Sequence, residues 1–290
     1  MIMNELNFGI EIETVGISRA EAAAAIHRVI GGRLGAESVT APDGRVWKAV
    51  RDGSLPAVHA EVVSPILRYR DIDTLQEIVR ALRNAGARPH SNAGIHIHVE
   101  AAAFSARQMA NLAKIIYKQE KLLIHALGIS AARLETYTKP VSERFIAEIN
   151  RKMPKTKEEL ARAYYGDNET HSSHYDRNRY HILNLHAAFT GPTVEIRAFE
   201  STLHAGKIKA YIQFVLALAE KAIKAKSTSS DKREFNRESA KYDLRVFLLG
   251  LGMIGDEFKT ARLHLLNNMP GDAAFKTQAQ RDAHNRRRAA

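Results

Sequence analysis

The sequence has no cysteine, a single tryptophan, and no hydrophobic run that approaches the length of a membrane span. Without cysteine, disulfide frameworks, zinc ribbons, iron–sulfur clusters and thiol nucleophiles are excluded, so any metal ion must be held by Asp, Glu, His or backbone oxygen. A membrane span needs about 20 apolar residues. The first residues also lack the basic segment and apolar stretch of a signal peptide. These absences predict a cytoplasmic protein with no membrane partner.

Several catalytic motifs are missing as well. The chain contains no G-x-x-x-x-G-K-S/T loop, no H-E-x-x-H and no G-x-S-x-G, which excludes a P-loop, a zincin helix and a nucleophile elbow. Residues 250–255 match G-x-G-x-x-G. No later strand is expected that could complete a βαβ unit around them, so this segment is predicted to be a turn between helices.

The composition is that of a basic globular protein. The 290 residues are 45% hydrophobic and carry a net charge of +11, which allows one large domain or two ordinary ones and favours nucleic acid, nucleotides or acidic substrates as partners. In the last fifteen residues, five basic side chains stand against Asp282, which gives this tail a charge of +4. The rest of the chain keeps +7 and is therefore basic too.

The hydrophobic pattern predicts an α+β fold with a mainly antiparallel sheet. Two S-x-x-E/Q capping boxes, at Ser18 and Ser105, mark helix starts. We expect strands at 4–14, 45–50, 58–67, 94–100, 180–188 and 193–199, and helices at 18–30, 72–85, 105–128 and 204–226. The polar segment 138–178 is predicted to be an insertion or lid. After a serine-rich linker, residues 227–290 are predicted to form a helical C-terminal appendage with a basic tail.

Three of the expected strands share an unusual pattern, two polar residues at i and i+2 among apolar ones. The pairs are Glu11 with Glu13, His96 with His98, and Glu195 with Arg197. Because successive side chains on a strand point to opposite faces, each pair lies on one face. A solvated face of an antiparallel sheet gives the same pattern at any single strand, and a single histidine is most often a satisfied core residue. The agreement of three strands favours one shared polar cavity.

The residue types in these pairs suit a metal ion and a polyanion. Asp52-Gly53-Ser54 and Glu61 add further oxygen ligands on or near a strand. Carboxylate-rich sites with few histidines bind hard cations such as Mg²⁺ or Mn²⁺. Arg197 adds a planar fork that can hold a phosphate or carboxylate. Together these groups indicate phosphoryl transfer.

The same segments resemble the amidoligase family, a branch of the carboxylate-amine ligases similar to glutamine synthetase and glutamate-cysteine ligase. The matching stretches, in the family's order, are FGIEIE at 8–13, DGSL at 52–55, EVVSPIL at 61–67, AGIHIHV at 93–99 and TVEIRAFESTL at 193–203. The resemblance implies a glutamine synthetase-like catalytic fold over residues 1–226, with a curved, mainly antiparallel sheet that has helices on its convex face. It also implies ATP and Mg²⁺ or Mn²⁺ as cofactors.

Carried over by motif, the resemblance also implies roles for individual residues. The metal ligands would be Glu11, Glu13, Glu61, His96 and Glu195. The catalytic residues would be Arg197, which steadies the transferred phosphate or the carboxylate, and Glu61. Contacts to cofactor or substrate would come from Asp52, Ser54, His98, Arg179 and Asn184.

The resemblance implies an ATP-dependent ligase that forms an amide bond from a carboxylate and an amine through an acyl phosphate. Segment 138–178, with His171 and His174, is the candidate cover that keeps water from that intermediate. The substrates would be small molecules or peptides. Two alternatives stay open: a phosphotransferase of related fold, and a non-catalytic protein that binds nucleic acid through the basic tail.

Overall fold

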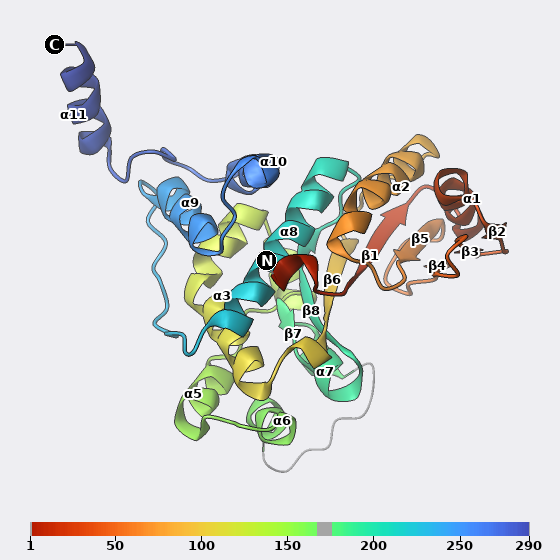
Figure 1. Ribbon diagram of the computed structural model, residues 1–290, viewed down its shortest axis with the longest axis horizontal. Helices are drawn as coiled ribbons and strands as arrows, with labels where there is room; N and C mark the ends of the chain where they lie inside the picture. Colours follow the sequence, from red (N-terminus) through yellow and green to blue (C-terminus); the bar gives the residue numbers. More distant parts are fainter. Residues whose placement is uncertain (1, 167–175, 290) are drawn as a thin grey trace.

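The computed structural model describes residues 2–166 and 176–289. In these residues, eight strands form one sheet in the order β2-β3-β4-β5-β1-β6-β8-β7, and all neighbouring strands are antiparallel (Figure 1). The strands are β1 Phe8–Val15, β2 Arg33–Leu34, β3 Ser38–Thr40, β4 Val46–Val50, β5 His59–Val63, β6 Gly94–Glu100, β7 Leu183–Asn184 and β8 Thr193–Glu200. The predicted α+β class with an antiparallel sheet is confirmed.

Two of the helices begin at the residues that the capping boxes predicted. Ser18 and Ser105 form complete capping boxes with Glu21 and Gln108. The main helices are α1 Arg19–Ile30, α2 Ile72–Asn84, α3 Ala106–Leu127, α4 Ala131–Thr136, α5 Glu143–Lys152, α6 Lys157–Tyr165, α7 His186–Thr190, α8 Ala205–Lys224, α9 Ala240–Gly250, α10 Lys259–Leu266 and α11 Gln278–Ala289. No described helix combines the length and apolar composition that a membrane span requires.

The G-x-G-x-x-G match is confirmed as a turn between helices. Helix α9 ends at Gly250, and Gly252 and Gly255 follow with φ angles of 85° and 84° before the short 3-10 helix Asp256–Phe258 and α10. These left-handed conformations favour glycine for steric reasons. The motif therefore changes the direction of the chain and lies in no βαβ unit.

The predicted strand at 180–188 is wrong over most of its length. Only Leu183–Asn184 pairs with the sheet as β7, and His186–Thr190 forms the short helix α7. The Oδ1 atom of Asn184 accepts a hydrogen bond from the N–H of Ala187 at 3.3 Å, which satisfies a backbone donor at the helix start. Apolar and polar residues alternate only from Leu183 to Ala187, and the helix His186–Thr190 packs against β8 instead of pairing with it.

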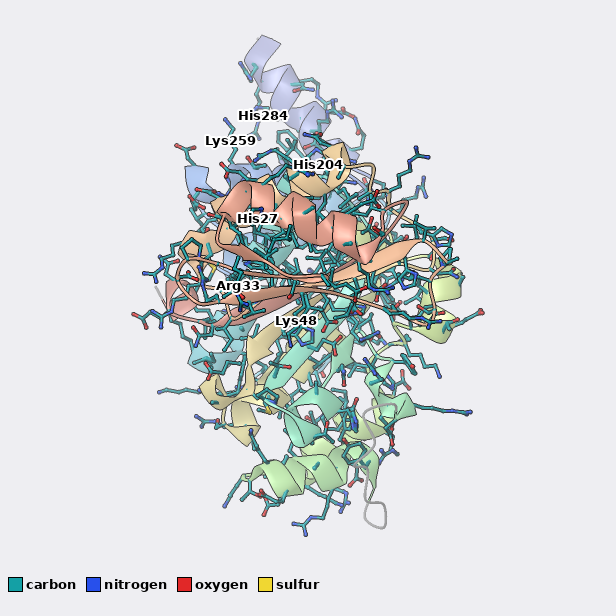
Figure 2. All side chains as sticks on the ribbon, turned by 90° about the vertical axis from the view of Figure 1, so that its right-hand side faces the viewer. His27, Arg33, Lys48, His204, Lys259 and His284 are labelled. Atoms are coloured by element: carbon teal, nitrogen blue, oxygen red, sulfur yellow. The ribbon has the colours of Figure 1, made fainter. Side chains whose placement is uncertain are left out.

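One face of the sheet packs against helices and carries the core. Ile10, Ile12 and Ile97 are at most 1% exposed. On this face α1 packs against β3, β4 and β5, α8 against β6, and α3 against β8. Figure 2 shows His27 of α1 and Lys48 of β4 on opposite sides of the strands. The other face of the central strands is therefore left for the polar side chains.

The segments predicted as insertion and appendage share this core. Phe145 of α5, Leu160 of α6, Leu244 of α9 and Leu265 of α10 belong to the same hydrophobic cluster as the sheet. The predicted role of 138–178 as a cover stays a prediction, and His171 and His174 lie outside the described residues.

The chain between α8 and α9, of which residues 227–230 were predicted as a linker, runs along α3 and bonds to it. The N–H of Arg233 donates to the carbonyl of Lys118 at 2.9 Å, and Lys232 forms an ion pair at 2.9 Å with Glu120, which is 2% exposed. The ring of Phe235 stacks on His125 with centroids 3.8 Å apart. We call residues 227–239 the strap. Beyond α10, helix α11 projects from the rest of the molecule (Figure 1).

Candidate active site

The polar face of the central strands lines a cavity of about 440 Å³. Its walls come from β1, β5, β6 and β8, the turn between β4 and β5, helix α4, and the segment from the 3-10 helix Arg177–Arg179 to α7. Every predicted site residue lies in this wall: Glu11, Glu13, Asp52, Ser54, Glu61, His96, His98, Arg179, Asn184, Glu195 and Arg197. The structure thus brings the predicted residues together, and the roles assigned to them stay predictions.

The register of the strands explains why these side chains meet. Glu11 lies opposite His96 and Glu13 opposite Glu61, on the two neighbours of β1. His98 in turn lies opposite Glu195 of β8. Directly opposite residues have Cβ atoms within about 5.5 Å and share a face. A shift of one residue in any of these pairings would turn its polar pair toward the core.

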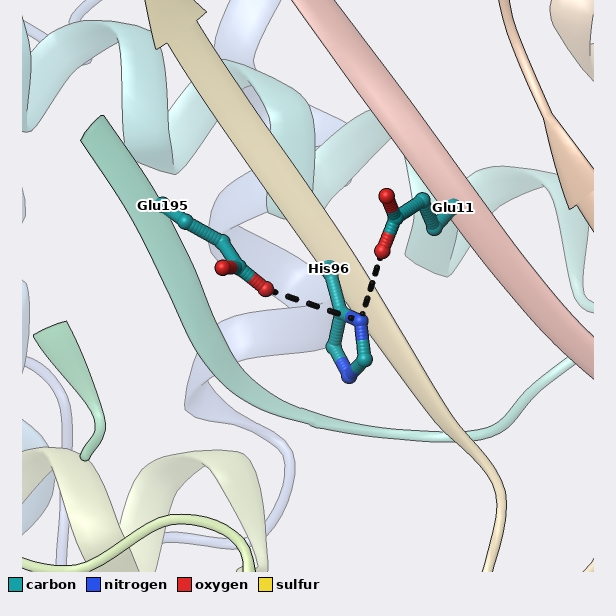
Figure 3. A group of neighbouring side chains, drawn as sticks. All are labelled: Glu11, His96 and Glu195. Carbon is teal, nitrogen blue, oxygen red and sulfur yellow. Dashed lines mark hydrogen bonds and ion pairs between the residues drawn. The ribbon is translucent and has the colours of Figure 1, made fainter. Parts of the chain in front are cut away.

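His96 lies at the centre of the carboxylates. Its Nδ1 atom is 2.9 Å from Oε2 of Glu11 and 3.6 Å from Oε1 of Glu195, and Figure 3 shows the ring between these two side chains. Its Nε2 atom is 3.7 Å from Oε1 of Glu13. In two overlapping groups, Glu11–His96–Glu195 and Glu13–Glu61–His96, the potential ligand atoms all lie within 4.8 Å of one another. Either group could hold a cation.

The carboxylates that share this cavity shift each other's pKa values. Burial, followed by the charges of Glu11, Glu13 and Asp52, raises the pKa of Glu61 to about 9. Burial also raises the pKa of Glu13, despite the hydrogen bond that its Oε2 atom accepts from Gly94 N–H at 2.6 Å. A cation among these oxygens would remove the repulsion that keeps protons on them.

Glu195 is held at both of its oxygens. Nη1 of Arg197 donates to Oε1 and Nδ2 of Asn184 donates to Oε2, each at 2.6 Å. Burial raises the pKa of Glu195, but the charge of Arg197, followed by those of His98 and His96, outweighs it, so the pKa lies below its usual value. Glu195 is therefore an ionised carboxylate in a fixed orientation.

His98 orients Glu11 from the other side. Its Nδ1 atom lies 3.1 Å from Oγ1 of Thr193, and its Nε2 atom 3.3 Å from Oε1 of Glu11. Burial raises the pKa of Glu11, but hydrogen bonds and charges from His96 and His98 lower it well below its usual value. This contact suits a histidine that supports a ligand, as second partners of metal ligands commonly do.

The turn that presents Asp52 and Ser54 depends on a histidine that sequence reasoning missed. The carboxylate of Asp52 accepts the N–H of Ser54 at 2.6 Å. The Nε2 atom of His59 accepts the N–H of Asp52 at 3.1 Å, and its Nδ1 lies 2.5 Å from the carbonyl of Pro56. His59 is 5% exposed, and with Glu61 it forms the same i, i+2 polar pair as the three strand pairs, which is the signal that could have found it.

Other lining residues were not predicted, among them Arg133, Tyr137 and His186. Arg133 and Tyr137 come from α4 and the residue after it, and His186 comes from α7, where a hydrogen bond joins its Nδ1 atom to the hydroxyl of Tyr165. These residues lie in segments with weak periodicity, and they reach the cavity only because those segments pack beside the sheet.

Comparison with known proteins identifies the family of this chain. A family model described as "Putative amidoligase enzyme" matches residues 4–219, which include all the matching stretches and the whole sheet. The chain belongs to this amidoligase family. Membership supports an enzyme of the carboxylate-amine ligase type. No curated protein matches this amidoligase in sequence.

Among solved structures, this amidoligase is similar to one described as a bifunctional glutathione synthetase from Pasteurella multocida. The TM-score is 0.45 and the identity 10%, and the match covers 98% of this chain. It covers 50% of the other chain, so the amidoligase spans half the length of that protein.

Proposed function

We propose that this amidoligase uses ATP to join a carboxylate to an amine through an acyl phosphate, on a sheet of the glutamine synthetase-like type. The observation that carries the proposal is the cluster around His96. Four glutamates from β1, β5 and β8 converge on one imidazole of β6, next to a buried arginine, inside one cavity. A solvated sheet face has no reason to bury Glu13, His96 and Glu195 to 3–4% exposure.

The donor set fits divalent cations. Carboxylate oxygens with one imidazole suit Mg²⁺ or Mn²⁺, and we assign Glu11, Glu13, Glu61, His96 and Glu195 as their ligands. The raised pKa of Glu61 supports this fit, since it reports negative charge that the protein alone does not balance. When bound, such cations neutralise phosphate oxygens during phosphoryl transfer.

The protein's own side chains would then position the nucleotide and the substrate. Arg197, fixed by Glu195, would hold the transferred phosphoryl group or the carboxylate, because its planar guanidinium binds both. Asp52, Ser54, His98, Arg179 and Asn184 would contact the nucleotide or substrate from the surrounding wall. Glu61, on the opposite side of β1 from His96, would complete the ligand set and so serve catalysis.

The reaction itself needs two displacements. A carboxylate oxygen attacks the terminal phosphorus of ATP, and ADP leaves. The amine nitrogen then attacks the acyl carbon, the C–N bond forms, and the C–O bond to phosphate breaks. The nitrogen loses a proton and inorganic phosphate leaves. Activation is required because a free carboxylate is a poor acyl donor.

An ADP-release screen with magnesium against pooled carboxylates and amines tests this function. We expect release by the wild type that requires metal, a carboxylate and an amine, and a loss of about 100-fold or more in Glu195→Ala. The exposed Glu77→Ala on α2 is the matched control and should keep full activity. Equal turnover in wild type and Glu195→Ala would contradict the assigned site. ADP release without consumption of amine would favour the phosphotransferase alternative.

A further inference from the structure

The cavity contains a second buried arginine that the proposed chemistry does not use. Arg133 is the buried residue of helix α4 and is 3% exposed, and it lines the same cavity as the carboxylate cluster. Its Nη1 atom donates to the carbonyl of Ala93 at 3.0 Å. A Cβ atom at Gly94 would lie 2.5 Å from its Nη2 atom, so a glycine at this position leaves room for the guanidinium.

The remaining edge of this guanidinium has no hydrogen-bond partner among residues 2–166 and 176–289. The buried Nε atom of Arg133 donates to no group in the described part of the chain. The charges of Glu13 and Glu200 act on Arg133 through space, but their oxygens accept the N–H groups of Gly94 and Ser130 instead. Arg197, in contrast, has its own carboxylate at 2.6 Å.

An arginine in this state is suited to a planar anion. A buried charge without a paired opposite charge is strongly unfavourable, and burial lowers the pKa of Arg133 although arginine stays protonated. With Nη1 occupied by a carbonyl, the Nε and Nη2 donors lie side by side on the free edge. Two parallel N–H donors match the two oxygens of a carboxylate.

An aromatic surface connects this arginine to Arg197. The Arg133 guanidinium carbon lies 5.8 Å from the ring centre of Tyr137, which meets Tyr180 edge-on at 6.3 Å. The guanidinium carbon of Arg197 lies 5.8 Å from the ring centre of Tyr180. A molecule along this surface could rest its carbon chain on two tyrosine rings, with an anionic group at each end.

We propose that Arg133 binds a substrate carboxylate other than the one that becomes the amide. The reacting group lies at the Arg197 end, an assignment that rests on the proposed function. The additional carboxylate has two sources. The acyl donor can be a dicarboxylate, or the amine acceptor can be an amino acid or a peptide.

Calorimetric titration of the full-length protein with matched probes tests the proposal and separates the two sources. Glutarate is compared with butyrate, and β-alanine with propylamine, in the presence of Mg²⁺ and ADP. We expect one member of a pair, the one with the extra carboxylate, to bind about tenfold to 100-fold more tightly than its partner. A preference for glutarate means that the acyl donor carries the additional carboxylate. A preference for β-alanine means that the amine acceptor carries it. No preference in either pair overturns the proposal.

Variants at Arg133 assign the preference to this side chain. Arg133→Met keeps the apolar stem and should abolish the preference, whereas Arg133→Lys keeps one charge without the fork and should retain part of it. The exposed Arg80→Met on α2 should behave as wild type. A preference that survives in Arg133→Met overturns the proposal. If that variant does not fold, Arg133→Lys decides, because an undiminished preference in Arg133→Lys overturns the proposal.

Titration with Mn²⁺ alone separates this inference from the proposed function. Wild-type and Arg133→Met proteins should bind Mn²⁺ equally, because Arg133 contacts none of the assigned ligand atoms. Mn²⁺ binding without any probe preference means that the Arg133 proposal is wrong and the metal-dependent function stands. If the probe preference depends on Arg133 but the protein does not bind Mn²⁺, the Arg133 proposal stands and the metal-dependent function is wrong.

Discussion

At the scale of single residues, Glu61 links the cavity to the stability of the metal-free protein. Its pKa of about 9 lies above its unfolded value of about 4.5. Between these two values the folded protein holds a proton that the unfolded chain releases, so stability falls as the pH rises through this range. The raised pKa of Glu13 and that of His98 act in the same direction.

The lowered pKa values act in a different range. Glu11 and Glu195 titrate below their usual values in the folded protein, so the stability that they contribute is present above their unfolded pKa and is lost only as the pH falls further. Their titration therefore does not change the stability of the protein between about pH 5 and pH 9.

We therefore expect Glu61→Gln to flatten the pH dependence of stability. Urea unfolding in EDTA measures the free energy of unfolding at pH 5 and pH 8.5. This free energy should fall less between the two pH values in Glu61→Gln than in the wild type. At pH 8.5 the variant should be more stable than the wild type by about 1–3 kcal/mol. Mn²⁺ should stabilise the wild type at pH 8.5 more than the variant. Parallel pH curves for the two metal-free proteins would refute the assignment of the raised pKa to Glu61.

At the scale of elements, the strap connects α8 to α9 and packs on α3. Its main polar contact is buried on one side only, because Glu120 is 2% exposed while Lys232 has 24% of its side chain exposed. Glu120 also accepts the N–H of Val141 at 2.6 Å and so ties the start of the 138–178 segment to α3. The same carboxylate thus joins three segments of the chain.

Lys232→Ala should destabilise the protein by about 1–3 kcal/mol, because it leaves the Glu120 carboxylate buried without its counter-charge. The nearby exposed Lys226→Ala is the control and should change stability by less than about 0.5 kcal/mol. Chemical denaturation measures both. Equal stability of the two variants would mean that the contact between Lys232 and Glu120 does not hold the strap on α3.

At the scale of the whole molecule, the basic tail and the cavity are separate. Helix α11 projects from the body, and none of its described residues lines the cavity (Figure 1). The tail nevertheless carries four units of the net charge. Any attraction for nucleic acid is therefore concentrated away from the site of the proposed chemistry.

Removal of residues 276–290 should leave Mn²⁺ affinity and ADP release unchanged. The nucleic-acid-binding alternative predicts in addition that the full chain is retained on DNA with a steep salt dependence, that the truncated chain is not, and that Glu11→Ala has no effect. Filter binding at several salt concentrations, beside Mn²⁺ titration, measures both properties. A loss of metal affinity on truncation would contradict the separation of tail and cavity.

Much of the fold and of the site was predictable at the level of local pattern. Alternation along β1, β6 and β8 predicted which side chains share a face, and capping boxes at Ser18 and Ser105 predicted where helices begin. Both signals act between residues close in the chain. Segment 180–188 was assigned wrongly for the same reason, since its alternation satisfied a strand while its environment required a short helix.

The sequence by itself determined the alternating polar faces, the capped helices, the absence of thiol chemistry and the concentration of charge in the tail, because each depends on neighbouring residues or on composition. Only the tertiary structure decided that His96 lies among four carboxylates, that Arg133 is buried beside Gly94, and that the strap packs on α3. These contacts join segments far apart in the chain, and their energies come from strand register and from burial, which no local window contains.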